Sequence, residues 1–575
     1  MNPTASPHSL PRATIVIVGG VAAGMSAATR YRRLDERANI VVLERSAHVS
    51  YANCGLPYHL SATIANRDDL LLQTPASLRA RFNLDVRVRH QVEGIDPAAK
   101  TVTGTNLTDG APFTLEYDAL VLAPGAEPMR PDMPGSSRGL TLRNVEDLDA
   151  IVAAMHTGAP GAEPGTAAVI GGGFVGLEVA ENLAMAGLAV NVIERAPQIL
   201  AALDEELASV LHRHLEANGV RVHVNTEVAQ VEVATLTLTD GATVPADLLI
   251  FALGVRPDLT LAHAAGLTIG PRGGIAVDDQ MHTSAPDIYA VGDAAEKFDA
   301  VDGTPTLIPL ANLANRHGRL VADAIAGRDP SAGVSQGTAI VQVFGLTAAM
   351  TGWTARRAAG AGRAVHVIHT HPLSHAGYFP RAQQMALKVV YDAADGTLLG
   401  AQGVGEDGVD KRIDVLAVAI AARMKVEQLA DLELAYAPAF GSAKDPVNMI
   451  GYIGANRRQG LSRAVQAGQL ETLVAAGAHL VDVRTAEEFA DGHLRGAVNV
   501  PVDELGVRMG DLPAGDLIVY CAVGVRAHVA EQALRQRGRT VANVDGGWAT
   551  ITASAAGASL ICAPATAGTA TPARP

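Results

Sequence analysis

A glycine-rich turn between a buried strand and a helix is the feature that most constrains how this chain folds. Ala167-Ala-Val-Ile170 predicts the strand, Gly171-Gly-Gly-Phe-Val-Gly176 fits G-x-G-x-x-G, and 177–185 predicts the helix. Val190-Asn-Val-Ile-Glu194 predicts a second strand that ends in an acid. Alone the glycine pattern is weak, but this order of elements is typical of a dinucleotide-binding domain. There the carboxylate of Glu194 accepts both ribose hydroxyls of NAD.

The N-terminal part of the chain repeats this arrangement. Thr14-Ile-Val-Ile-Val18 predicts a buried strand, and Gly19-Gly-Val-Ala-Ala-Gly24 predicts a tight turn. A helix over 25–34 and a strand over Val41-Val-Leu-Glu44 follow. The pattern is weaker here because Val21 replaces the middle glycine. Two such units in one chain imply a relay between two cofactors, each with its pyrophosphate at a helix N-terminus.

A short stretch after the first unit, Ser50-Tyr-Ala-Asn-Cys54-Gly-Leu-Pro-Tyr58, holds the first cysteine of the chain. A lone cysteine is commonly a small buried hydrophobic residue. Cys54, however, comes ten residues after Glu44, so a dinucleotide and a thiol could meet there. Cys54 is therefore a candidate redox group.

With the elements before it, the string SYANCGLPYHL resembles the single-cysteine branch of the flavoprotein pyridine nucleotide-disulfide oxidoreductases, and within it the coenzyme A-disulfide reductases. No second cysteine lies a few residues from Cys54, so an internal disulfide cannot form and the redox pair must be Cys54 with a substrate sulfur. Ala22 stands where the related NADH peroxidases and oxidases carry a histidine, which weakens a peroxide-reducing interpretation.

The resemblance implies FAD in the first unit and NADH in the second, with NADPH left open because Arg195 follows Glu194. The segment Thr283–Asp293 is similar to the second FAD signature of the family, in which Asp293 accepts a hydrogen bond from the ribityl chain. The residues implied for FAD are Gly19, Gly20, Ala22, Gly24, Glu44, Arg45, Asp293 and Ala311. Those implied for NAD(P)H are Gly171, Gly173, Phe174, Val175, Gly176, Glu194 and Gly254. Those implied for coenzyme A, as substrate or as bound cofactor, are Arg33, Ser50 and Asn53.

From about Ser331 the pattern of strands and helices becomes mixed and resembles the dimerisation domain of the same family. A strand is predicted over 386–391 and a helix over 411–424. Tyr378 and Tyr436 lie in strings that match coenzyme A-disulfide reductases, where a homodimer places these tyrosines over the partner's cysteine as hydrogen-bond or proton donors. His371 and His375 lack a cysteine or carboxylate at ligand spacing, so no metal site is predicted.

A fresh alternation of strand and helix begins near Gln469. Within it, Leu480-Val-Asp-Val-Arg484, Gly492-His-Leu-Arg-Gly496 and Asp545-Gly-Gly-Trp548 resemble a rhodanese sulfurtransferase in order and spacing. Leu517-Ile-Val-Tyr520 predicts a buried strand, and Cys521-Ala-Val-Gly-Val-Arg526 predicts a loop leading into a helix. Successive N–H groups of such a loop, with Arg526, would favour the thiolate, so the resemblance implies that Cys521 carries a persulfide. Cys562 falls in an Ala/Thr/Pro-rich tail and is interpreted as incidental.

The fold class predicted from these patterns is α/β, with two Rossmann-like dinucleotide-binding domains, an α+β dimerisation domain and a C-terminal α/β rhodanese domain. The predicted boundaries are a disordered leader (1–12), an FAD-binding domain (13–155 and 285–330), an NAD(P)H-binding domain (156–284), a dimerisation domain (331–455), a linker (456–468), a rhodanese domain (469–555) and a disordered tail (556–575).

Composition excludes several other classes of protein. A net charge of −14 disfavours a general nucleic-acid binder, because phosphate contacts need clustered Lys and Arg. No apolar run reaches the ~18 residues of a membrane helix, and the first residues lack the apolar core of a secretory signal. The three cysteines are odd in number and far apart, which fits a reducing cytoplasm better than a disulfide framework.

Together these patterns predict a flavin-dependent NAD(P)H oxidoreductase that reduces coenzyme A disulfide, coenzyme A persulfide or polysulfide through Cys54, with an appended sulfurtransferase. Its partners would be a small-molecule sulfur substrate and a second copy of the chain. Two alternatives remain: an NADH oxidase, and a sulfur carrier or redox sensor with a structural flavin. The physiological sulfur donor, and whether Cys521 passes sulfur directly to Cys54, stay open at this stage.

Overall fold

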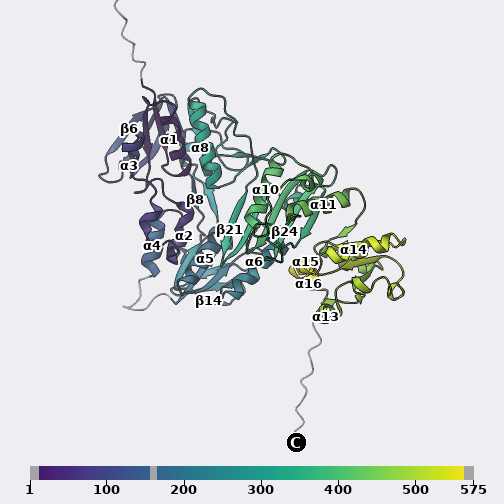
Figure 1. Cartoon of the computed structure of the whole chain (residues 1–575). Coiled ribbons are helices and arrows are strands. Elements are labelled where there is room, and N and C mark those ends of the chain that lie inside the picture. The colour runs from purple at the N-terminus through teal and green to yellow at the C-terminus, as the bar shows by residue number, and fades with distance from the viewer. Residues whose placement is uncertain (1–11, 156–164, 563–575) are drawn as a thin grey trace, which may run out of the picture. The chain divides into compact units, whose positions relative to one another are not determined.

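The computed structural model describes residues 12–155 and 165–562, which form two compact units (Figure 1). One unit comprises the described residues of 1–199 and 218–337, and the other comprises 200–217 and the described residues of 338–575. The predicted leader, apart from Arg12, and the end of the predicted tail over 563–575 lie outside the described residues.

The first unit contains a parallel sheet with the strand order β17-β7-β1-β2-β3. Its strands are β1 (Thr14–Val18), β2 (Asn39–Leu43), β3 (Asp85–Arg87), β7 (Ala119–Leu122) and β17 (Ile288–Ala290). Helices α1 (Ala22–Arg32) and α8 (Ala311–Ile325) lie side by side and share one core with β1 (Figure 1). Helix α1 begins three residues before the predicted helix, because Val21 is already its N-cap.

A second parallel sheet in this unit has the order β11-β10-β9-β15. Its strands are β9 (Thr166–Ile170), β10 (Ala189–Ile193), β11 (Arg221–His223) and β15 (Leu248–Phe251), and helix α5 (Phe174–Met185) connects β9 to β10. In both sheets the carboxyl end of the first strand runs into a glycine turn and then a helix. The two predicted Rossmann-like units are therefore confirmed.

Smaller elements complete the first unit. Its further strands are β4 (His90–Asp96), β5 (Thr101–Asn106), β6 (Pro112–Glu116), β8 (Ala126–Pro128), β12 (Val228–Val231), β13 (Thr235–Leu238), β14 (Thr243–Pro245), β16 (Val255–Pro257), β18 (Lys297–Asp299), β19 (Pro305–Thr306) and β20 (Val334–Ser335). Its further α-helices and 3-10 turns are η1 (Asn53–Gly55), α2 (Leu56–Leu60), η2 (Arg67–Leu70), α3 (Pro75–Phe82), η3 (Ser136–Arg138), α4 (Val145–Met155), α7 (Thr260–Ala264) and η4 (Gly292–Ala294).

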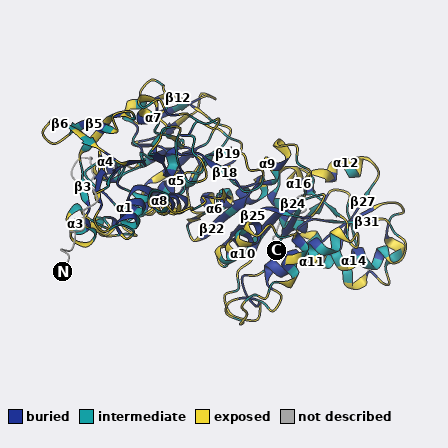
Figure 2. Ribbon diagram, turned by 90° about the horizontal axis from the view of Figure 1, so that it is seen from above, coloured by how far each residue is buried: buried dark blue, intermediate teal, exposed yellow. Residues whose placement is uncertain are grey.

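The second unit contains an antiparallel sheet in the order β21-β22-β25-β24-β23. Its strands are β21 (Ala339–Val343), β22 (Leu346–Gly352), β23 (Val365–Thr370), β24 (Met385–Asp392) and β25 (Leu398–Gly405). Figure 2 shows the central strands as buried, and every residue of β25 is buried. Helices that belong to this part are α6 (Glu205–Ala217), α9 (Ala355–Gly360), α10 (Val409–Ala421), η5 (Val426–Asp431) and α11 (Pro446–Arg458). This part contains the predicted dimerisation domain, but α6 was predicted within the NAD(P)H-binding domain over 156–284 and instead groups with the second unit.

A five-stranded parallel sheet with the order β26-β31-β30-β27-β29 forms the C-terminal part of the second unit. Its strands are β26 (Ala464–Val465), β27 (His479–Asp482), β29 (Val498–Asn499), β30 (Leu517–Tyr520) and β31 (Val541–Val544). The other elements are η6 (Ala467–Gln469), α12 (Leu470–Ala475), α13 (Ala486–Ala490), β28 (His493–Leu494), η7 (Val502–Glu504), η8 (Met509–Asp511), α14 (Val525–Arg535), α15 (Gly547–Ala553), α16 (Ala555–Ala558) and β32 (Ile561–Cys562).

The segment predicted as a polar linker over 456–468 is ordered. Helix α11 continues to Arg458, and β26 pairs in parallel with β31. Arg457, near the end of this helix, donates a hydrogen bond to the Val367 carbonyl oxygen. The predicted disorder of 556–562 is wrong, because β32 pairs with β28 and Ile561 packs on the neighbouring core.

The return of the chain to the first sheet begins earlier than the predicted boundary at 285. Leu261, Leu267 and Ile275 are buried in the same core as Val16 and Leu120. Burial of these side chains, rather than their position after the NAD(P)H fingerprint, decides which sheet this segment joins.

Candidate active sites

The first glycine turn has the geometry that a bound pyrophosphate requires. Gly19 has φ +104°, and a Cβ on Gly24 would lie 1.9 Å from the Gly19 carbonyl oxygen, so neither position admits a side chain. No side chain caps α1, whose first turn is therefore available to an anion. The Glu44 carboxylate accepts hydrogen bonds from the N–H groups of Gly20 and Ser46, both at 2.8 Å. These residues fit the adenosine diphosphate half of FAD.

The second glycine turn repeats this geometry. Gly171 has φ +108°, and a Cβ on Gly176 would lie 1.9 Å from the Gly171 carbonyl oxygen. Gly173, the N-cap of α5, faces open space, as a turn that receives a pyrophosphate must. The Glu194 carboxylate accepts from the N–H groups of Gly172 at 2.8 Å and Ala196 at 2.7 Å. The turn fits NAD(P)H.

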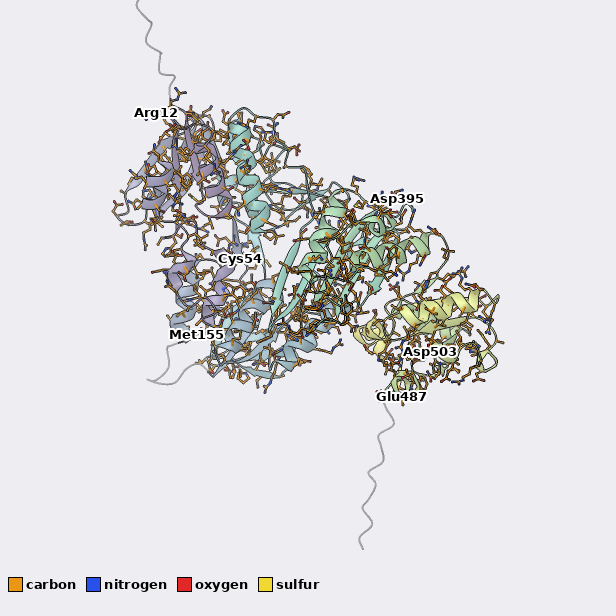
Figure 3. The ribbon with its side chains drawn as sticks, in the orientation of Figure 1. Arg12, Cys54, Met155, Asp395, Glu487 and Asp503 are labelled. Carbon is orange, nitrogen blue, oxygen red and sulfur yellow. The ribbon has the colours of Figure 1, made fainter. Side chains whose placement is uncertain are left out.

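Cys54 lies in η1, immediately before α2, and is exposed (Figure 3). Ser50 has φ +49°, and its N–H donates to the Gly20 carbonyl oxygen at 2.8 Å. Asn53 Nδ2 donates to the carbonyl oxygen of Arg143. The loop is thus tied to the first glycine turn at one end and to Arg143 at the other, which brings the predicted residues Ser50, Asn53 and Cys54 together.

The protein around Cys54 raises the pKa of its thiol. Although part of the residue reaches solvent, partial burial is the largest cause; the Glu178 carboxyl adds to it and the Arg143 guanidinium opposes it. Helix α2 has five residues, so its dipole is small. Arg143 is therefore the cation that favours the Cys54 thiolate.

Glu178 is a residue near Cys54 that sequence patterns did not single out. It lies on α5, and its Oε1 accepts a hydrogen bond from the Tyr58 hydroxyl at 3.1 Å. Burial raises the pKa of Glu178 to about 7; the Tyr58 hydrogen bond lowers it and Glu181 raises it further. Two acids in an otherwise apolar helix, Glu178 and Glu181, were the available sequence signal.

Arg143 is the second residue that was missed. Its Nη2 forms an ion pair with Asp293 Oδ2 at 2.9 Å, and its main-chain N–H donates to Asp147 at 2.8 Å. The same guanidinium lies next to Gly125, where a Cβ would be 3.2 Å from Nη2. Arg143 thus connects the Cys54 loop to Asp293, the predicted ribityl acceptor. The signal was weak, because a lone arginine in a loop has many ordinary roles.

Other predicted binding residues are dispersed. Ala311 begins α8, whose N-cap supplies no side-chain bond, as expected for a helix end that faces a ligand. Gly254 has φ +92° in the turn after β15. Arg45 is paired with Glu127 and, at 3.5 Å, with Asp258. The predicted coenzyme A residue Arg33 is the C-cap of α1, at the opposite end of that helix from the glycine turn and ~16 Å along it.

The second unit brings Tyr378 and Tyr436 together. Their hydroxyl oxygens are 3.1 Å apart, and both residues are exposed. The hydrogen bond to Tyr436 raises the pKa of Tyr378. The N–H of Ala376 donates to the Gly441 carbonyl oxygen and so joins the two loops. The predicted tyrosine pair therefore exists within one chain.

Cys521 lies at the carboxyl end of β30 and is buried. The N–H of Gly524 donates to its Sγ at 3.2 Å, and Gly524 has φ +92° as the N-cap of α14. Arg526 forms two hydrogen bonds of 2.7 Å with the Glu488 carboxylate, which hold the pKa of Glu488 down at about 2. The predicted loop is confirmed, and Arg526 interacts with both Glu488 and Cys521.

Within 12–155 and 165–562, no three His, Cys, Asp or Glu side chains gather as a metal ion would require. None of the helices in these ranges is long and apolar enough to cross a membrane.

Comparison with known proteins places each part of the chain. The family model of pyridine nucleotide-disulphide oxidoreductases matches 13–318, the model of their dimerisation domain matches 338–446, and the rhodanese-like domain model matches 466–554. The chain is 33% identical to the coenzyme A disulfide reductase of Staphylococcus haemolyticus over 439 residues. This aligned region covers 76% of this chain and 98% of that protein.

Two solved structures extend the similarity to nearly the whole chain. The reduced Bacillus anthracis CoADR-RHD is 41% identical with a TM-score of 0.93, covering 96% of this chain and 99% of that one. An NAD-dependent persulfide reductase from A. fulgidus is 35% identical with a TM-score of 0.87, and the match covers 93% of this chain and 99% of that one.

Proposed function

Because this chain belongs to the pyridine nucleotide-disulphide oxidoreductase family, we propose that it uses NADH to reduce the sulfur–sulfur bond of coenzyme A disulfide, coenzyme A persulfide or polysulfide. The observation that carries this proposal is Cys54, an exposed thiol in a loop tied to the first glycine turn, with no other cysteine near it in the sequence. The substrate class is supported by relatives named coenzyme A disulfide reductase and persulfide reductase.

Cys54 performs the bond exchange. Its thiolate attacks one sulfur of the substrate, a bond to Sγ forms as the sulfur–sulfur bond breaks, and the other sulfur leaves as coenzyme A thiolate, as hydrosulfide or, from a polysulfide, as the shortened polysulfide. FAD, when bound, supplies two electrons from NADH. These two electrons and one proton cleave the mixed disulfide, releasing the thiol and restoring the Cys54 thiolate. Glu178 is the group beside Cys54 that can hold this proton near neutral pH.

The preference for NADH is inferred from Glu194. Both carboxylate oxygens are held by main-chain N–H groups, which fixes the negative charge at the end of β10. A 2′-phosphate at that position would be repelled. Arg195 is mostly exposed and lies 3.6 Å from Glu227, so its charge is directed away from this carboxylate.

The two C-terminal parts extend this proposal. Cys521 would accept sulfane sulfur as a persulfide in its loop of N–H groups. The dimerisation domain supports a homodimer in which Tyr378 and Tyr436 donate protons to a thiolate leaving at the partner's active site.

The test is a pair of serine variants in the FAD-loaded protein. Cys54→Ser should bind FAD and accept electrons from NADH, yet lose reduction of coenzyme A disulfide and persulfide, measured as NADH consumption and sulfide release. Cys521→Ser should lose thiosulfate-dependent activity and keep coenzyme A disulfide reduction. Cys562→Ser is the matched control and should resemble the wild type in both assays.

Three outcomes would contradict the proposal. Retained disulfide reduction in Cys54→Ser would exclude the thiol mechanism. Oxygen consumption as fast as sulfur reduction in the wild type would indicate an NADH oxidase. An inability of NADH to reduce the bound FAD would indicate a sulfur carrier or sensor.

A further inference from the structure

A buried carboxylate, Asp545, lies at the end of β31 within the rhodanese-like part. It is 2% exposed and has several partners from the polypeptide. Its Oδ2 accepts from the main-chain N–H of His369 at 3.0 Å, from His369 Nδ1 at 2.8 Å and from Gln466 Nε2 at 3.0 Å, and its Oδ1 pairs with Arg457. Burying a carboxylate lowers the stability of a protein unless the carboxylate is fully hydrogen-bonded, so the fold requires these partners of Asp545.

His369, on strand β23, comes from outside the rhodanese-like match, which begins at 466. Its Nε2 lies 2.7 Å from Glu206 Oε1, and Lys388 pairs with both Glu206 and Asp204. Burial lowers the pKa of His369, but the bonds to Asp545 and Glu206 outweigh burial and raise it. Since both ring nitrogens face carboxylates, the protonated form of His369 donates in two directions.

The turn that follows Asp545 supports the Cys521 loop directly. The N–H of Trp548 donates to the Cys521 carbonyl oxygen at 2.8 Å. A Cβ on Gly547 would lie 2.4 Å from that oxygen, and a Cβ on Gly546 would lie 2.8 Å from His369 Cβ. The backbone of this turn therefore contacts the Cys521 loop on one side and His369 on the other.

We propose that His369 is a positioning residue for sulfur transfer at Cys521, acting through the Asp545 carboxylate and the glycine turn after it. The imidazolium holds Asp545, Asp545 holds the turn, and the turn holds the Cys521 carbonyl that begins the persulfide loop. The dimerisation domain thereby completes the sulfurtransferase site. This inference rests on the sulfurtransferase activity proposed above.

The experiment compares two variants that each keep one of the two donors of His369. In His369→Asn the amide replaces Nδ1–H and still reaches Asp545; in His369→Gln it replaces Nε2–H and reaches Glu206 instead. With full-length, FAD-loaded protein, the assay is thiocyanate formation from thiosulfate and cyanide. His369→Gln should lower kcat by about ten- to a hundredfold, the cost of misplacing a reacting group by about an ångström, while His369→Asn should stay within about threefold of wild type.

Controls separate this effect from general damage and from failure of the proposed function. His366→Asn, on the same strand but exposed, should not alter the rate. Coenzyme A disulfide reduction should be unchanged in all three variants. Alkylation of Cys521 by iodoacetamide, followed by peptide mass spectrometry, reports the loop even if the wild type transfers no sulfur, and it should slow in His369→Gln alone. Equal rates in the Asn and Gln variants, in transfer and alkylation alike, would overturn the proposal.

Discussion

Glu178 is a residue whose burial works against stability. Its carboxyl is partly buried where α5 packs on α2, and its pKa of about 7 means that ionisation at neutral pH is unfavourable. A carboxyl that folding shifts from 4.5 to about 7 costs about 3 kcal/mol once both states are ionised. Destabilising groups of this kind concentrate at active sites, where their chemistry is needed.

The first prediction concerns Glu178→Gln. A raised carboxyl pKa contributes its stability below pH 4.5 and loses it as the pH rises through about 7, so the neutral amide should match the wild type at pH 4.5 and exceed it at pH 8. The expected gain at pH 8 is several degrees in Tm, measured by thermal unfolding of the FAD-loaded protein.

Although Glu178→Gln should raise the Tm at pH 8, it should lower the enzymatic activity. If Glu178 carries the proton for the thiolate, NADH-driven coenzyme A disulfide reduction should fall about 10²-fold in Glu178→Gln. Glu116→Gln, exposed on β6, is the control for removal of a carboxylate charge. A Tm difference between Glu178→Gln and wild type that is the same at pH 4.5 and pH 8 would contradict the assigned burial effect.

At the scale of elements, the two strand–turn–helix units need glycine for two different reasons. Gly176 is required by packing, because the Gly171 carbonyl oxygen lies 1.9 Å from where its Cβ would be. Gly173 has an ordinary extended backbone and nothing within 4 Å of its Cβ position. A side chain at Gly173 would therefore collide only with a bound ligand.

The second prediction separates these reasons. Gly176→Ala should cost ~2–4 kcal/mol of stability through backbone overpacking. Gly173→Ala should leave the Tm of the nucleotide-free protein within about a degree of wild type, yet raise the Kd for NADH at least about tenfold by approaching the pyrophosphate. Thermal unfolding without nucleotide and titration with NADH measure both. Unchanged NADH affinity in Gly173→Ala would show that the pyrophosphate does not sit on this turn.

At the scale of the whole molecule, the exposed tyrosine pair bears on how two copies of the chain assemble. Tyr378 and Tyr436 share a hydrogen bond and are exposed, which is unusual for two aromatic side chains in contact unless another surface covers them. In the proposed homodimer that surface is the Cys54 site of the partner subunit.

The third prediction tests this by complementation. Cys54→Ser and the double variant Tyr378→Phe/Tyr436→Phe should each be inactive as homodimers in coenzyme A disulfide reduction. A heterodimer of the two, co-expressed with different affinity tags, has one site with both Cys54 and the tyrosines if they act across the dimer. It should therefore recover about half of the wild-type rate. An inactive heterodimer would mean that each chain uses its own tyrosines.

Sequence alone determined the features that depend on local spacing. The two glycine turns, the loop that carries Cys54 and the loop that carries Cys521 were predicted correctly, because strand, turn and helix are encoded within about thirty consecutive residues. The tyrosine pair and the order of domains came from resemblance to a known family. Part of the tail was predicted wrongly, because small residues become ordered when a distant strand pairs with them.

Tertiary structure decided what depends on residues far apart in the chain. Glu178 meets Tyr58 across 120 residues, Arg143 meets Asp293 across 150, and His369 meets Asp545 across 176. None of these pairs has a local pattern, since each partner is an ordinary charged or polar residue in its own segment. Their effects on the Cys54 thiol and the Cys521 loop arise from burial and proximity, which packing creates and no spacing along the sequence encodes.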